Sequence, residues 1–274
     1  MELTSDQKVT LNIELSVNAA AKETVVYHKP LRHPVFLSAI DNINTGKYND
    51  ALLQLQQLIK SNSISPVTRA AALNKASLCL KNTGNYTGAV SMLSKIITNS
   101  SYPVNERGFA LFQRATIQKT LLHNLQAAIS DFNQYVIDFP NGIWVEEALY
   151  STAELYYLIN DFKNAAPEFQ KYCDHYKDAG FQHEKALYTL GTIYSHHLSD
   201  FNRARSTFTR LLQEYPNSRY TEDVVFWNAD CLLRQGHASR ALMEFTNYIK
   251  RYPSGKWQLD AVNRLKKIET AEAH

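Results

Sequence analysis

The side chains of this sequence that come nearest to a metal-ligand pattern are histidines. His196 and His197 are adjacent, and adjacent side chains on a helix point about 100° apart, so these two cannot share a metal ion. His175 and His183 flank a segment expected to form a loop, and ordinary surface positions account for them. We therefore expect no metal site.

The cysteines could form disulfides or act as nucleophiles. Cys79, Cys173 and Cys231 are odd in number and far apart in the sequence. Isolated cysteines commonly behave as small buried apolar residues. We expect three buried free thiols.

Carboxylates could perform acid–base chemistry, but here they recur regularly. Glu146, Glu184 and Glu222 are spaced by 38 residues, at or just before predicted helix starts, where a negative charge favours the helix dipole. The sequence has no glycine-rich phosphate loop, His-Glu-x-x-His, Cys-x-x-Cys or Gly-x-Ser-x-Gly motif. We predict no catalytic residue, no cofactor and no enzyme activity.

The same period of 38 residues organises the whole chain. Small residues recur at Ala39, Ser77, Ala115, Ala153, Gly191 and Ala229. A second register pairs a small residue with a large apolar one four positions later: Ala51/Leu55, Ala89/Leu93, Ala128/Phe132, Ala165/Phe169, Ala204/Phe208 and Ala241/Phe245. A spacing of four places both members on one helical face.

Each period therefore predicts a pair of amphipathic helices, called A and B here, joined by a turn such as that at Gly46, Gly84 or Gly236. A small residue on helix A lets helix B cross closely. Pro167 lies inside the fourth helix B, so we expect this helix to start late or to kink.

The details of the period resemble the tetratricopeptide repeat (TPR) over about residues 33 to 260. The matching features are Gly46-Lys47-Tyr48, Gly84-Asn85-Tyr86, and tyrosines at Tyr156 and Tyr194. The endings Phe139-Pro140, Tyr215-Pro216-Asn217-Ser218 and Tyr252-Pro253-Ser254-Gly255 resemble the bacterial envelope branch of TPR proteins. That branch includes the lipoprotein of the outer-membrane β-barrel assembly machine and the periplasmic coordinator of the Tol-Pal system.

We predict an all-α fold, a right-handed solenoid of about six helix pairs. The repeats run about 33–66, 67–105, 106–142, 143–180, 181–218 and 219–254, within a repeat region spanning 33–260. Residues 255–274 form a capping helix and tail, with an apolar stripe of Trp257, Ala261, Leu265 and Ile268.

Residues 1–32 differ, because apolar side chains alternate with polar ones from Val9 to Val17, which predicts a short extended, β-like arm. An isolated hairpin is marginal in water. The arm could lean on the first repeat, pair with another chain, or be disordered.

The composition excludes several classes of protein. The 274 residues are 45% hydrophobic and 20% charged with a net charge of +3, which is ordinary for a globular protein and too weakly basic for nucleic-acid binding. We expect no membrane span. With no signal peptide in the chain as written, we expect a cytoplasmic location; a periplasmic one follows if a signal has been removed.

The TPR resemblance implies that the A helices line a concave groove that holds a peptide or helix of a protein partner. The groove residues it implies are Phe109, Phe112, Lys119, Glu147, Tyr150, Glu154, Tyr157, Lys185, Tyr188 and Phe226. The aromatic row among them either packs between repeats or also contacts the ligand. The clamp of chaperone-associated TPRs is matched only at Asn74 and Lys81, which argues against a co-chaperone.

The sequence thus predicts a non-catalytic protein-binding scaffold, with bacterial envelope assembly as its context by resemblance. The alternatives are a cytoplasmic adaptor and a regulatory TPR module of a longer multidomain protein. The partner's identity and the oligomeric state stay open.

Overall fold

The computed structural model describes residues 33–272, so the predicted β-like arm lies outside the described residues. The described part is all-α, as predicted. Its elements are α1 (Pro34–Asn44), α2 (Tyr48–Lys60), α3 (Pro66–Asn82), α4 (Tyr86–Ile97), α5 (Val104–Thr120), α6 (Leu125–Asp138), α7 (Val145–Leu158), α8 (Phe162–His175), α9 (Phe181–Thr192), the π-helical turn η1 (Ile193–His197), α10 (Phe201–Glu214), α11 (Thr221–Arg234), α12 (Ala238–Arg251) and α13 (Gln258–Glu272).

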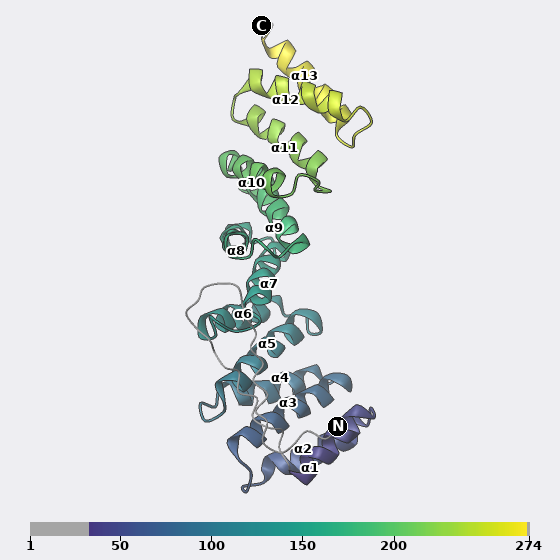
Figure 1. Ribbon diagram of the computed structural model, residues 1–274, viewed down its shortest axis with the longest axis vertical. Helices are drawn as coiled ribbons and strands as arrows, with labels where there is room; N and C mark the ends of the chain where they lie inside the picture. The colour runs from purple at the N-terminus through teal and green to yellow at the C-terminus, as the bar shows by residue number, and fades with distance from the viewer. Residues whose placement is uncertain (1–32, 273–274) are drawn as a thin grey trace, which may run out of the picture. The chain divides into compact units, whose positions relative to one another are not determined.

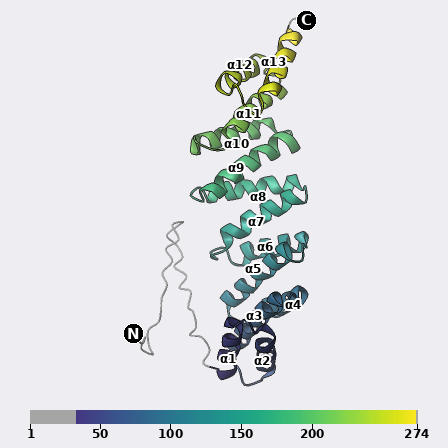
Figure 2. The same cartoon turned by 90° about the vertical axis from the view of Figure 1, so that its right-hand side faces the viewer.

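The chain divides into two compact units, and the boundary between Ala148 and Leu149 falls inside α7. Within each unit the helices stack in chain order, with A and B helices alternating (Figure 1, Figure 2). This alternation of stacked helix pairs is the architecture of an α-solenoid.

The small residues of the 38-residue period lie in the interior of the helix pairs. All six are buried, and Ala39, Ala115, Ala153 and Ala229 have no exposed surface. A Cβ atom added to Gly191 on α9 would lie 2.3 Å from the ring of Phe208 on α10. The two helices therefore meet at a distance that only a very small side chain allows, as predicted.

The turns between helices A and B share one backbone conformation. Each contains a residue with positive φ: Gly46, Gly84, His123, Asn160, Ser199 and Gly236. The following helix B is capped by a side chain in four of the six pairs, through Asn85, Asn124, Asp161 and Asp200, each accepting a hydrogen bond from the amide three residues on. A left-handed turn followed by a cap fixes where helix B begins.

The sequence prediction was wrong about the start of α8, and it did not include the π-helical turn η1. Of the two expected effects of Pro167, a late start or a kink, the late start is wrong, because α8 begins at Phe162 and Pro167 lies inside it. The N-cap Asp161 accepts a hydrogen bond from the backbone amide of Asn164 at 3.3 Å. In the fifth pair, Gly191 and Ala204 are one residue further apart than Ala153 and Ala165. The π-helical turn η1 accommodates this extra residue.

Helix α13 packs on the last helix pair through the predicted apolar stripe. Ala261 and Ile268 are buried against α11 and α12, and Trp257 and Leu265 pack beside them. The ring of Trp257 stacks on Phe226 with centroids 5.0 Å apart.

Candidate functional site

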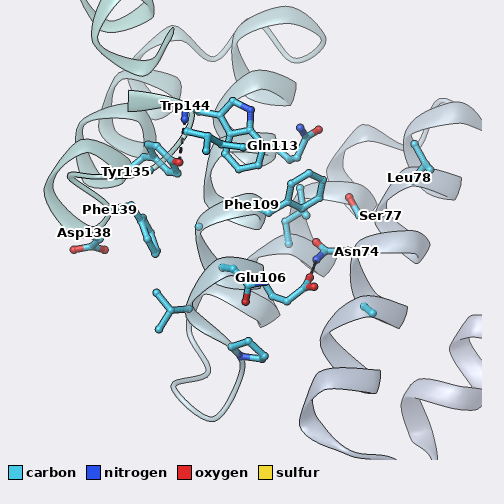
Figure 3. Close-up of a pocket in the computed structure, with 18 of the residues that line it drawn as sticks. Asn74, Ser77, Leu78, Glu106, Phe109, Gln113, Tyr135, Asp138, Phe139 and Trp144 are labelled. Carbon is cyan, nitrogen blue, oxygen red and sulfur yellow. Dashed lines mark hydrogen bonds between the residues drawn. The ribbon is translucent and has the colours of Figure 1, made fainter. Parts of the chain in front are cut away.

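A pocket of about 1050 Å³ lies within the first unit (Figure 3). It is bounded by α3 and α5, both A helices, and by the segment from the end of α6 to the start of α7. Its volume is that of a site able to enclose several ligand side chains.

The polar floor of the pocket joins α3 to α5. The Asn74 side-chain amide donates a hydrogen bond to the Glu106 carboxylate (Figure 3). The Asn74 Oδ1 atom is buried and has no hydrogen-bond partner among the described residues. Burial raises the pKa of Glu106, while the Asn74 hydrogen bond and the charge of Lys75 act in the opposite direction.

The walls of the pocket are largely apolar. Phe109 and Trp144 lie with their ring centroids 5.7 Å apart. Val104 and Ile143 also line the pocket, yet 59% and 50% of their respective surfaces stay exposed to solvent. Exposed apolar side chains around an apolar hollow are typical of a surface that binds a partner.

The charged lining residues include both signs. Lys75 and Lys81 come from α3, and Glu106 and Asp138 come from α5 and α6. Opposite charges on different walls can orient a partner segment, and they do not select a strongly charged ligand.

Phe112 and Tyr188 of the predicted aromatic row pack against rings of the following repeat. Phe112 stacks on Trp144 with centroids 5.1 Å apart, and Tyr188 stacks on Tyr220 at 4.1 Å. Since Phe112 is 5% exposed and Phe226, which stacks on Trp257, is 1% exposed, neither offers a ligand much surface. We therefore assign these two rings to packing between repeats and leave them out of the binding surface.

Other predicted groove residues come together in the second unit. The Lys185 Nζ atom lies 3.7 Å from a Glu154 carboxylate oxygen and 5.8 Å from the centre of the Tyr150 ring. Tyr150 is only 8% exposed, with its ring edge-on to Tyr172. Tyr157 is 36% exposed.

The remaining predicted groove residues are placed less centrally. Tyr188 is half-buried and donates a hydrogen bond to Asp223 at 3.1 Å. Lys119 on α5 and Glu147 on α7 lie outside the pocket lining, whereas Phe109 lies inside it.

Asn74, Glu106 and Trp144 of the pocket were not predicted as site residues. The available signal was Asn74, which lies one period of 38 residues before Phe112, at a position that carries a ring in the other five repeats: Phe36, Phe112, Tyr150, Tyr188 and Phe226. Its significance depends on Glu106, which follows 32 residues later, and the sequence pattern alone did not single out that position.

The predictions for the histidines and for the cysteines had different outcomes. His183 is not a surface residue as expected: it is fully buried, with Nδ1 2.8 Å from the Tyr215 hydroxyl and Nε2 2.9 Å from the Cys173 carbonyl. The three cysteines are buried and free, as predicted. The described residues contain no group of three or more His, Cys, Asp or Glu side chains placed to hold a metal ion.

The recurrent glutamates occupy the predicted helix starts. Glu146, Glu184 and Glu222 lie in the first turns of α7, α9 and α11.

Among residues 33–272, none of the helices combines the length and apolar character needed to cross a lipid bilayer.

Comparisons with known proteins agree with this architecture. A family described as outer membrane lipoprotein matches residues 105–230, and a tetratricopeptide repeat family matches residues 37–102. No curated protein matches the sequence of this chain.

Solved structures with a similar fold include a tetratricopeptide repeat protein from Parabacteroides merdae ATCC 43184. It has 17% sequence identity and a TM-score of 0.50, and the likeness covers 86% of this chain and 91% of that one. The C-terminal part of a TPR repeat-containing protein from Cytophaga hutchinsonii has 16% identity and a TM-score of 0.50, covering 86% and 88%. At this identity the likeness concerns the fold alone. The chain thus has the fold of tetratricopeptide-repeat proteins; residues 37–102 match a tetratricopeptide repeat family, and residues 105–230 resemble the outer membrane lipoprotein family.

Proposed function

We propose that this protein is a scaffold that holds a peptide or helical segment of a partner protein on its A helices, as part of a bacterial envelope assembly. TPR families serve as protein-interaction scaffolds and are generally non-catalytic. The observation that carries the proposal is the pocket between α3 and α5, since both are A helices and its walls expose apolar side chains.

The envelope context rests on the family matched by residues 105–230, which is an outer membrane lipoprotein family. This match supports the periplasmic alternative over the cytoplasmic location expected from the chain as written. The cytoplasmic adaptor and the regulatory module remain the competing proposals.

Two surfaces are proposed to contact the partner, one in each unit. The first is the pocket, with Phe109 on its wall. The second is the ion pair of Glu154 and Lys185 beside the buried Tyr150 ring, with the more exposed Tyr157 nearby on α7. Aromatic side chains supply large contact areas at a small entropic cost, which is why they dominate binding hot spots.

Site-specific photo-crosslinking tests the proposal. A photoreactive phenylalanine analogue replaces Phe109 in one variant and Leu53 in another; Leu53 on the B helix α2 of the same unit is 62% exposed and serves as the control. We expect protein crosslinks from position 109, enriched in the envelope fraction of a native lysate, and few from position 53. Equal crosslinking at both positions would contradict the groove, and crosslinks confined to the cytosolic fraction would favour the adaptor.

A further inference from the structure

Two repeats share a stacked ring pair that is missing at the pocket. Phe112 stacks on Trp144, and Tyr188 stacks on Tyr220; each partner follows its row residue by 32 positions. One period before Phe112 and Trp144 stand Asn74 and Glu106. At these two positions the chain carries polar side chains instead of rings. The pocket between α3 and α5 lies where two stacked rings would otherwise pack.

The polar groups at this place are incompletely paired. Glu106 accepts one hydrogen bond from Asn74, and the buried Asn74 Oδ1 has no partner among the described residues. Asn74 Oδ1 has almost no accessible surface, so a ligand in the pocket does not reach it in this structure. The half-buried Glu106 carboxylate lines the pocket and can accept a further hydrogen bond from a ligand. Phe109 and the apolar wall beside these atoms favour a ring over a fully polar group.

The second unit shows how this chain pairs ring donors with a carboxylate. Asp223 accepts hydrogen bonds from the indole Nε1 of Trp257 at 2.5 Å and from the hydroxyl of Tyr188 at 3.1 Å. Both donors belong to rings of the stacked pairs. A ring with a polar edge therefore satisfies a half-buried acceptor between repeats.

Building on the proposed function, we propose that the pocket binds a tyrosine or tryptophan side chain of the partner segment. The ring fills the open place beside Phe109, and its O–H or N–H donates to the Glu106 carboxylate. Phenylalanine or leucine would fill the same space but would bring no donor for this carboxylate. The pocket thus selects an aromatic residue that carries a hydrogen-bond donor.

Peptide selection on the full chain tests this assignment. A random dodecapeptide library displayed on phage is enriched on the immobilised chain, and the enriched peptide is synthesised with tyrosine, phenylalanine or leucine at its anchor position. We expect the tyrosine version to bind about fivefold more tightly than the phenylalanine version, the effect of about one net hydrogen bond.

Two variants and a control test which residue of the pocket causes the preference for tyrosine. Glu106→Leu removes the acceptor, and Glu106→Gln keeps an acceptor of the same shape but removes the negative charge. We expect Glu106→Leu to abolish the preference for tyrosine and Glu106→Gln to reduce it. Asn217→Leu, at an exposed position between α10 and α11, should keep it.

The outcomes separate this inference from the proposed function. Equal binding of the tyrosine and phenylalanine peptides, or a preference that survives both pocket variants, would overturn the assignment while leaving a peptide-binding scaffold. Failure to enrich any peptide would count against the proposed function itself. Tyr27 belongs to the β-like arm that the sequence predicts over residues 1–32. A gain in peptide affinity on Tyr27→Ala would show that a residue of this chain competes for the pocket and would overturn the assignment to a partner.

Discussion

Individual residues in this protein are constrained most strongly where two helices touch. At Gly191 the ring of the fully buried Phe208 occupies the space that a Cβ atom would need. The small-residue period predicted this crossing from the sequence, because a spacing of four and a small side chain are local properties. The ring pairs were not predictable in the same way, since which rings stack depends on how successive repeats dock.

Gly191→Ala should lower the free energy of unfolding by about 1–3 kcal/mol, because the new methyl group overlaps Phe208 in a closely packed interface. Thermal and denaturant unfolding measure this change. The double variant with Phe208→Leu provides the control: the two changes should be non-additive, because the smaller side chain makes room for the methyl group. Strict additivity would mean that α9 and α10 do not meet at this point.

The buried His183 should make stability depend on pH. Burial lowers the pKa of His183 below its ordinary value of 6.5, with Arg210 and Lys177 acting in the same direction and the Cys173 carbonyl and Glu214 opposing. Below pH 6.5 the unfolded chain therefore binds a proton that the folded chain resists, so stability falls as the pH drops from 6.5 toward the lower folded pKa.

His183→Gln should remove part of this loss. The measurement is the difference in melting temperature between about pH 7.5 and about pH 5.5, which should be smaller in the variant than in the wild type. His175→Gln, at an exposed position on α8, is the matched control and should leave the difference unchanged. An identical pH dependence in wild type and His183→Gln would show that His183 does not titrate in this range.

At the scale of whole elements, the turn between helices A and B sets the geometry of each pair. Glycine turns were predicted at Gly46, Gly84 and Gly236, because glycine is the residue that accepts positive φ most readily. The left-handed residues His123 and Ser199 and the π-helical turn η1 were not predicted, since the longer segments there leave several ways to place one extra residue.

Exchanging residues at these turns should change stability in opposite directions. Gly84→Ala should cost about 1–2 kcal/mol, because φ is +81° there and nothing lies within 4 Å of the added Cβ, which leaves backbone strain as the cause. Ser199→Gly should gain roughly 0.5–1 kcal/mol by relieving the strain of its φ of 53°. Chemical denaturation of both variants checks the signs, and a stabilising Gly84→Ala would contradict the turn geometry.

At the scale of the whole molecule, the chain forms two compact units, and each contains at least one buried thiol. The repeat pattern predicted the all-α fold, but it is continuous across Ala148 and gave no sign of the boundary. The pocket likewise depends on a departure from the repeat pattern, at Asn74 and Glu106. How large a pocket this departure leaves is determined by the packing of the helices around it.

Labelling of the three thiols can follow the unfolding of each unit separately. Burial raises the pKa of Cys173 and Cys231 to about 12 and also raises the pKa of Cys79, so few reactive thiolates exist at neutral pH. We expect no labelling of the native chain by a thiol reagent. Under denaturant, Cys79 should become reactive as the first unit unfolds and the other two as the second unit unfolds, as followed by peptide mass spectrometry. Rapid labelling of the native protein would contradict this burial.

The central claim is that the pocket between α3 and α5 holds the partner. The most direct test fills it with rings, as the next repeat does with Phe112 and Trp144, by combining Asn74→Phe with Glu106→Trp. Partner affinity and melting temperature are measured together, using the segment recovered by crosslinking at position 109. We predict that affinity falls by about tenfold or more, the typical loss when a hot spot is removed, while the melting temperature stays the same or rises. Unchanged affinity in a folded double variant would show that the partner binds elsewhere.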